Sequence, residues 1–328
     1  MSHAIVMCIE KGSLEYKGLC LLVTLRRNWG RFKDVPIYIY SPRRGKEVSP
    51  WLTEAFKKLG AVHITIPLNE KYADYPLANK PLSMAHAEKN VECDYLIFLD
   101  SDILCWSEPI LFTLPDGKDL AMTVDTTKAV ASAGPDDPFD RVWMDLYQKA
   151  QAEHFPYVTT SLTNERVRGW WGSGVIVTRR SAGLMSRWHD LFESALETTP
   201  FFPEMTYLRE QMIICALAAS VWPRFQELPI AYNYQVQNYD HFSEGGFPPQ
   251  DAVLWHYQPF FNKVFRKFGE RLDQISDVQK KITAANNFSN ELHVRYKKMI
   301  SLDVNWLEAT RKTLKIGPRL KGFFDRFL

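Results

Sequence analysis

Two aspartates, Asp100 and Asp102, follow an apolar run at residues 95–99 and are separated only by the small Ser101. The run YLIFL is β-prone and apolar on both faces, which predicts a central parallel strand packed between helices. Ligands of such sheets bind at the carboxyl ends of the strands, where this pair would lie. Two neighbouring carboxylates need a countercharge, and their oxygens suit Mg²⁺ or Mn²⁺ shared with substrate phosphates. The tripeptide therefore predicts a metal–diphosphate site, against the plainer alternative of a solvated acidic turn.

The elements around this pair alternate between β-prone runs and amphipathic segments, which is typical of a parallel α/β sheet. Strands are predicted at residues 4–9, 35–40, 62–66, 95–99 and 120–124, and helices at 16–27, 51–59 and 82–90. Further along, the sequence predicts a loop over the site at 126–140, a glycine-rich aromatic turn and strand at 169–178, helices at 181–196 and 206–219, and a strand at 254–257.

The composition narrows the class of protein. The chain has 328 residues, 46% of them hydrophobic and 24% charged, which is ordinary for a globular α/β protein with a sizeable core. A net charge of +2 gives no global field, so we expect no nucleic-acid partner. Five scattered cysteines indicate neither a disulfide framework nor a metal motif. Without a leader or about 18 consecutive apolar residues, we expect a cytoplasmic location, with any membrane contact limited to the inner face.

Other strand-end chemistries fit less well. The first loop contains neither GxGxxG nor GxxxxGK[ST], which disfavours dinucleotide and P-loop sites and sugar nucleotidyltransferases with a glycine-rich first loop. Phosphatases of the haloacid dehalogenase type also use Asp-x-Asp after a strand, but normally after the first strand and with Thr or Val next. Here the motif follows about a hundred residues and precedes Ile103 and Leu104.

Several motifs occur in an order that resembles nucleotide-sugar glycosyltransferases of the GT-A fold, most of all family 8, which includes glycogenin and bacterial lipooligosaccharide galactosyltransferases. They are Lys80, FLDSD at residues 98–102, GWWGSGVIV at 169–177, Arg209-Glu210-Gln211, LPIAYNY at 228–234 and LWHYQ at 254–258. The resemblance implies an α/β fold with a Rossmann-like, mostly parallel central sheet, flanking helices and a helical C-terminal extension.

The resemblance also implies roles for individual residues. Asp100, Asp102 and His256 match the ligands of the divalent cation. Glu210 and Gln211 match the Asp-Gln pair near the anomeric carbon. The donor would be contacted by Ile9 of the first loop and by Lys80, Ser101, Trp171, Gly172, Ser173, Gly174 and Lys263. Five residues, 258–262, precede Lys263 where the family has Gly and then Lys-Pro-Trp, so this lysine is displaced.

These assignments describe a hexosyl transfer from a nucleoside diphosphate sugar, favoured as a UDP sugar, in which a divalent ion stabilises the leaving diphosphate. The resemblance favours retention of configuration, with Glu210 and Gln211 steadying the oxocarbenium-like centre. An inverting reaction, with Glu210 as the base that deprotonates the acceptor, stays open. So does a protein that binds sugar nucleotides without turnover.

The C-terminal part has a different character. We expect the transferase domain at residues 1–262 and a helical, charged extension at 263–328. Its last segment, residues 311–328, interleaves Lys and Arg with Phe and Leu, a composition that can bind an anionic membrane surface. The sequence therefore suggests a glycan or lipid-linked acceptor, with a packed C-terminal helix as the equal alternative for this segment.

Overall fold

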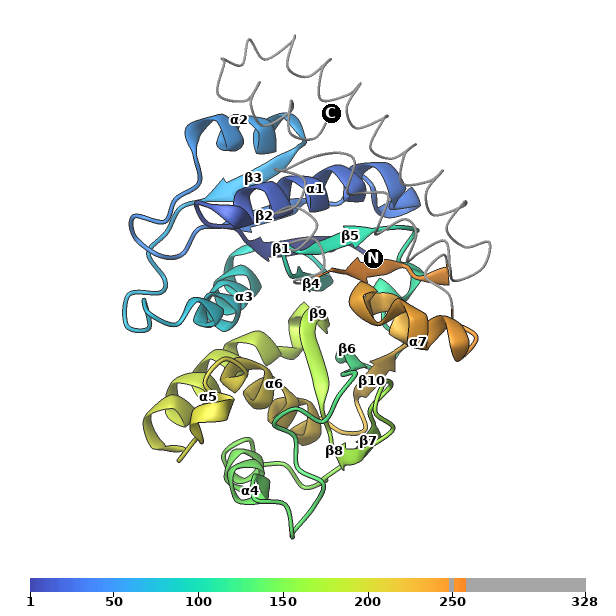
Figure 1. Ribbon diagram of the computed structural model, residues 1–328. Helices are drawn as coiled ribbons and strands as arrows, with labels where there is room; N and C mark the ends of the chain where they lie inside the picture. Colours follow the sequence, from blue (N-terminus) through green and yellow to red (C-terminus); the bar gives the residue numbers. More distant parts are fainter. Residues whose placement is uncertain (248–250, 258–328) are drawn as a thin grey trace, which may run out of the picture. The chain divides into compact units, whose positions relative to one another are not determined.

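The protein is represented by a computed structural model, which describes residues 1–247 and 251–257. In this part of the chain a seven-stranded sheet has the order β10-β6-β9-β4-β1-β2-β3 (Figure 1). Its strands are β1 (His3–Cys8), β2 (Ile37–Tyr40), β3 (Ala61–Ile64), β4 (Tyr95–Leu99), β6 (Leu120–Val124), β9 (Trp171–Arg179) and β10 (Phe225–Leu228). Every neighbouring pair is parallel except those of β9, which runs antiparallel to both β4 and β6. The predicted α/β fold with a mostly parallel central sheet is confirmed.

Helices cover the sheet. They are α1 (Ser13–Asn28), α2 (Pro50–Lys58), α3 (Asn79–Asn90), α5 (Leu184–Thr198) and α6 (Arg209–Ser220), and α4 (Asp140–Lys149) packs on α5 and α6. A short helix, α7 (Tyr239–Glu244), belongs to a second unit of the chain. Alternate side chains of the strands, such as Val6 and Phe98, share one core cluster with Met84 of α3, Trp188 of α5 and Ile213 of α6. This follows from the two-residue period of a strand, which sends Val6 and Phe98 to one face and their neighbours to the other.

The opposite face receives α1. Gly18 on this helix lies so close to Ile9 that a methyl group added at Gly18 would be 2.0 Å from Cδ1 of Ile9. Glycine is therefore required here for α1 to approach the end of β1. Since β1 and β4 are adjacent and parallel, the start of α1 is brought to the same edge of the sheet as Asp100 and Asp102.

Two smaller sheets complete the described structure. One has the order β11-β12-β5, with β5 (Ile103–Cys105), β11 (Tyr234–Gln235) and β12 (Leu254–His256). The other pairs β7 (Tyr157–Thr159) with β8 (Arg166–Arg168). Strands of two or three residues are too short to show a periodicity, and among these short strands only β12 was predicted.

The glycine-rich turn predicted within residues 169–178 is wrong in part. β9 begins at Trp171, so Gly172, Ser173 and Gly174 lie on a buried central strand instead of in a turn. The C-terminal extension predicted at 263–328 lies outside the described residues. Within the described residues, no helix has the length and apolarity needed to cross a membrane.

Candidate active site

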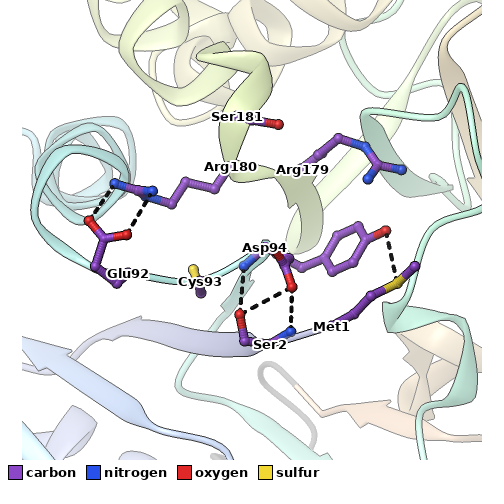
Figure 2. A pocket seen from close by; sticks show the side chains of 9 residues that line it. Met1, Ser2, Glu92, Cys93, Asp94, Arg179, Arg180 and Ser181 are labelled. Atoms are coloured by element: carbon purple, nitrogen blue, oxygen red, sulfur yellow. Dashed lines mark hydrogen bonds and ion pairs between the residues drawn. The ribbon is translucent and has the colours of Figure 1, made fainter.

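The two ends of the central strands, where β1 and β4 begin and where they end, carry different side chains. A cavity of 470 Å³ lies where β1 and β4 begin and β9 ends (Figure 2). Its polar lining is internally paired, since Asp94 accepts a hydrogen bond from the backbone N–H of Ser2 at 2.6 Å and Arg180 pairs with Glu92 at 3.2 Å. Among the described residues, none of the predicted site residues lines it. Asp100, Asp102, Lys80, Glu210 and His256 gather instead at the carboxyl end of β4, the edge where α/β sheets bind their ligands.

The acidic pair is held by a tight turn. The N–H of Asp100 donates to the carbonyl of Gly174 on β9 at 2.9 Å, and the N–H of Ile103 donates back to the carbonyl of Asp100 at 3.2 Å. Ser101 is buried inside this turn, 8% exposed. The chain then enters β5 directly, so that Asp102 lies between the central sheet and the small sheet.

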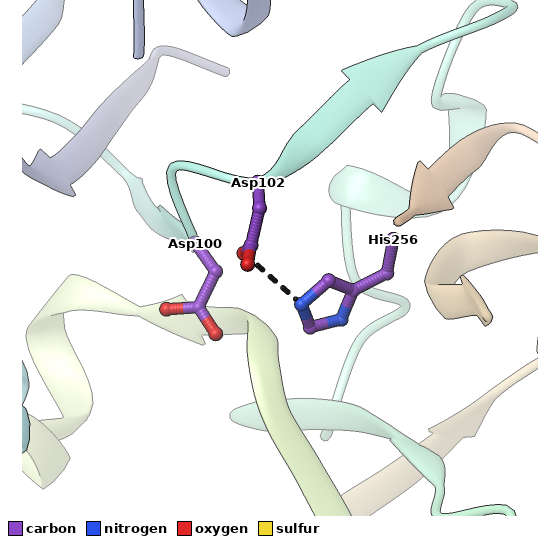
Figure 3. A group of neighbouring side chains, drawn as sticks. All are labelled: Asp100, Asp102 and His256. Atoms are coloured by element: carbon purple, nitrogen blue, oxygen red, sulfur yellow. Dashed lines mark hydrogen bonds and ion pairs between the residues drawn. The ribbon is translucent and has the colours of Figure 1, made fainter. Parts of the chain in front are cut away.

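The small sheet brings His256 to this pair, although it lies more than 150 residues further along the chain. β12 runs antiparallel to β5 with His256 opposite Ile103, the residue after Asp102. Nε2 of His256 lies 3.2 Å from Oδ1 of Asp102 (Figure 3). One ligand atom from each of Asp100, Asp102 and His256 can be chosen so that all three lie within 4.8 Å of one another.

The other ring nitrogen of His256 is also engaged. Nδ1 lies 2.8 Å from Oδ1 of the buried Asn233, the residue just before β11. The burial of His256 disfavours its protonated form, but the hydrogen bond to Asp102 and the charge of Asp102 outweigh burial and raise its pKa. Burial also acts against ionisation of Asp102, and the hydrogen bond and charge of His256, together with Lys17, reverse this and lower its pKa. Each group therefore stabilises the charged form of the other.

Two glycines make room for these contacts. A methyl group at Gly174 would lie 2.7 Å from Cε1 of His256 and 3.2 Å from Oδ2 of Asp100. One at Gly172 would lie 2.7 Å from Nδ2 of Asn233. The sequence predicted that these glycines let a ligand approach the backbone. The structure shows that they let His256 and Asn233 approach it.

A second, buried cluster adjoins the acidic pair. Nζ of Lys80, on α3, lies 3.0 Å from Oδ2 of Asp100, 3.1 Å from Oε1 of Glu210 and 3.1 Å from Oγ of Ser173. Burial of the Lys80 ammonium acts against its charge, but the charges of Asp100 and Glu210 outweigh it and raise its pKa. Ser173 also donates to Oε1 of Glu210 at 2.9 Å. Four predicted site residues from α3, β4, β9 and α6 therefore lie in direct contact.

Glu210 and Gln211 begin α6 and lie in different environments. Burial raises the pKa of Glu210, and its Oε2 has no hydrogen-bond partner among the described residues. Nε2 of Gln211 donates to Oδ2 of Asp125 at 2.7 Å. Burial also raises the pKa of Asp125. Sequence reasoning missed Asp125, although it follows the strand at 120–124 as Asp100 follows the strand at 95–99.

Sequence reasoning also missed Lys17 and Asn233. Nζ of Lys17, on α1, lies 3.4 Å from Oδ2 of Asp102. A lysine on an amphipathic helix is normally solvated, so only the adjacency of β1 and β4 identifies it. Asn233 lies within the LPIAYNY motif at 228–234, but the motif gave no reason to single it out.

Two residues predicted to contact the donor are buried in the core. Ile9 is fully buried, its N–H donates to the carbonyl of Tyr40 and its carbonyl accepts from Oγ of Ser41, so it has no group left for a nucleotide. Trp171 is also fully buried. Its ring packs against Phe225 with a centroid distance of 4.4 Å, and therefore no face is available to a sugar. Lys263 lies outside the described residues.

The comparison of the whole sequence with known protein families gives the class of protein. A family model described as "Rhodobacterales glycosyltransferase domain" matches residues 5–216. The chain belongs to this family and is a glycosyltransferase, which confirms the predicted enzyme class. The matched region includes Lys80, Asp100, Asp102, Ser173 and Glu210, and ends before His256.

Solved structures of other glycosyltransferases resemble the chain at low identity. The bifunctional glycosyltransferase WbbM shares 12% identity over 78% of this chain and 46% of its own, with a TM-score of 0.49, so the chain spans less than half of WbbM. Mouse xyloside xylosyltransferase 1 shares 13% sequence identity over 79% of this chain and 98% of its own, with a TM-score of 0.45. The galactosyltransferase LgtC shares 13% sequence identity over 78% of this chain and 87% of its own, also with a TM-score of 0.45. No curated protein matches the sequence significantly.

Proposed function

We propose that this glycosyltransferase moves a hexose from a nucleoside diphosphate sugar, favoured as a UDP sugar, to a glycan or lipid-linked acceptor in a reaction that depends on a divalent cation. The observation that carries the proposal is the convergence of Asp100, Asp102 and His256 from two separate sheets, with ligand atoms within 4.8 Å of one another. Carboxylates and an imidazole brought together at the ligand-binding edge of the sheet are a suitable donor set for a metal ion.

The residues present fit such an ion. Gly174 keeps the space between His256 and Asp100 free of a side chain, and Asn233 fixes the ring of His256 through Nδ1, so that Nε2 faces the carboxylates. A partner on the second ring nitrogen is the usual support of a metal-ligating histidine. Mg²⁺ prefers an all-oxygen shell, so the imidazole favours Mn²⁺. When bound, the ion would supply Lewis-acid stabilisation of the charge that develops on the leaving diphosphate.

The buried cluster supports a role for Glu210 near the sugar. Its Oε1 is held by Lys80 and Ser173, whereas its buried Oε2 has no partner. A buried carboxylate oxygen without a partner is unfavourable, and a sugar hydroxyl or the positive charge that builds at the anomeric carbon would satisfy it. Ser173 and Lys80 would then act as positioning residues that keep this carboxylate ionised.

The same burial supports retention of configuration. A base for an inverting reaction must lie within hydrogen-bond reach of the acceptor hydroxyl, about 2.6–3.2 Å. Glu210 is only 2% exposed, and one of its oxygens is held by Ser173 and Lys80. The anomer released from a labelled donor, followed by NMR, distinguishes retention from inversion.

The test is donor hydrolysis by the full chain. A panel of UDP, GDP, dTDP and CMP sugars is incubated with Mn²⁺, Mg²⁺ or EDTA, using wild type, Asp102→Asn and the control Asp116→Asn. Asp116 is an exposed turn residue that precedes β6. We expect hydrolysis that requires the metal and falls at least about 100-fold in Asp102→Asn only. Tight, metal-dependent nucleotide binding without turnover would instead favour a non-catalytic sugar-nucleotide-binding protein.

Membrane contact is a separate proposal that rests on the sequence of residues 311–328, which lie outside the described residues. Their alternation of basic and aromatic side chains supports binding to anionic vesicles, at the inner face of a membrane. Co-sedimentation with phosphatidylserine vesicles should be lost when residues 313–328 are deleted, and equal sedimentation of both chains would refute it.

A further inference from the structure

Lys17 is a cationic side chain beside Asp102. Its Nζ lies 3.4 Å from Oδ2 of Asp102, and its side chain is 13% exposed. It reaches this point because α1 follows β1, Asp102 follows β4, and the two strands are parallel neighbours. An ammonium group is therefore built into the same edge of the sheet as the three proposed metal ligands.

The other lysine of the site, Lys80, is committed to the protein. Its three N–H donors have three acceptors at 3.0–3.1 Å, on Asp100, Glu210 and Ser173. Moving this ammonium to a phosphate would leave Glu210 buried beside no positive charge, which is strongly unfavourable. Lys80 is therefore better suited to holding Asp100 and Glu210 in place than to binding the donor directly.

Lys17 differs from Lys80 in the way it meets its carboxylate. The distance to Asp102 is longer, at 3.4 Å, and Asp102 also has His256 at 3.2 Å. If Lys17 turns away, Asp102 keeps a cationic neighbour. The four-carbon stem of a lysine allows its ammonium to shift between nearby anions, which suits a group that exchanges a carboxylate for a phosphate.

We propose that Lys17 binds the diphosphate of the donor, and that its ion pair with Asp102 is the resting arrangement of the same side chain. The inference rests on the proposed function, since it needs a nucleoside diphosphate beside the proposed metal ligands. It assigns a phosphate contact to a residue of α1, whereas the sequence resemblance implied donor contacts for Lys80 and Lys263.

The inference predicts effects of opposite sign on two ligands, which a merely structural residue would not show. In Lys17→Met, a cation that competes for Asp102 is removed, so Mn²⁺ alone, followed by electron paramagnetic resonance, should bind about two- to tenfold more tightly. With Mn²⁺ present, UDP, GDP or dTDP should bind at least about tenfold more weakly by calorimetry, because a charge-assisted hydrogen bond is lost. Lys17→Arg should keep most of the nucleotide affinity, and Lys33→Met, at an exposed lysine beyond the end of α1, should change neither ligand.

The outcomes separate this inference from the function on which it rests. If wild type binds one of these nucleoside diphosphates and Lys17→Met binds it within twofold, the role of Lys17 is wrong and the proposed function stands. If Lys17→Met weakens Mn²⁺ and nucleotide alike, Lys17 is structural and the inference is again wrong. If wild type binds no nucleoside diphosphate with Mn²⁺ or Mg²⁺, both proposals fail together.

Discussion

Gly174→Ala is the substitution that tests the proposed metal site most directly, because it removes no ligand and changes no charge. Gly174 lies on β9 with ordinary extended backbone, so alanine is compatible with its conformation. The added methyl carbon would lie 2.7 Å from Cε1 of His256 and 3.0 Å from Nδ1. Ordinary van der Waals contact begins near 3.4 Å, so the ring must move by about 0.7 Å.

This displacement sets the size of the expected effect. Metal–ligand distances tolerate about 0.2 Å, so a ring displaced by several times that amount no longer coordinates well. His256 cannot move freely, because its Nδ1 is held by Oδ1 of Asn233 at 2.8 Å. We therefore expect Mn²⁺ affinity to fall at least about tenfold, and the free energy of unfolding to fall by about 1–3 kcal/mol from overpacking.

Two measurements separate these effects. Electron paramagnetic resonance of free Mn²⁺ gives the affinity, and urea unfolding in EDTA gives the metal-free stability. Gly245→Ala is the matched control, since the nearest atoms to its added methyl group lie at 3.5 Å. Unchanged Mn²⁺ affinity in a folded Gly174→Ala protein would mean that His256 is not a ligand, and would refute the proposed site geometry.

Three further predictions concern the neighbours of this site. Lys80→Met should lower the free energy of unfolding by about 3–5 kcal/mol, because Asp100 and the buried Glu210 lose their shared ammonium, and adding Glu210→Gln should recover much of this in urea unfolding. The metal-free protein should lose stability as pH rises from about 6.5 through the raised pKa of His256, because the folded state holds this proton more tightly than the unfolded state. Urea denaturation from pH 6 to 9 should show this fall in the free energy of unfolding for wild type and not for His256→Gln. Asn233→Ala should weaken Mn²⁺ binding about 10–100-fold, whereas Asn90→Ala, at a surface amide that only caps its own helix, should not.

The predictable part of the fold is the part with local periodicity. β1, β2, β4 and β6 are apolar runs of four or more residues, and α1, α2, α3, α5 and α6 are segments of nine or more residues without a helix-breaking interruption. The strand ends were therefore predictable, and Asp100 and Asp102 with them. The small sheet was not, because β5 and β11 are too short to show a pattern and pair only through tertiary contacts.

The differences between the expected and the observed surroundings of the site residues have a related cause. Glycines at 172 and 174 with two tryptophans before them indicated a turn open to substrate, but the sequence cannot show which atom requires a missing Cβ. In the structure those atoms belong to His256 and Asn233, and both tryptophans are buried in the core. Lys17 was missed because its partner Asp102 is distant in sequence, and only the order of the strands brings the two side chains together.

The charges of the site indicate that cation and donor bind together. With His256 protonated, the carboxylates of Asp100, Asp102 and Glu210 face Lys17, Lys80 and His256, so the charges of these six groups are balanced. A diphosphate alone would then meet acidic oxygens with no net attraction. Exchange of the His256 proton for a divalent cation makes the cluster more positive by one charge and leaves Lys17 with a weaker hold on Asp102. The diphosphate is attracted only in that state, and therefore each ligand should raise the affinity for the other.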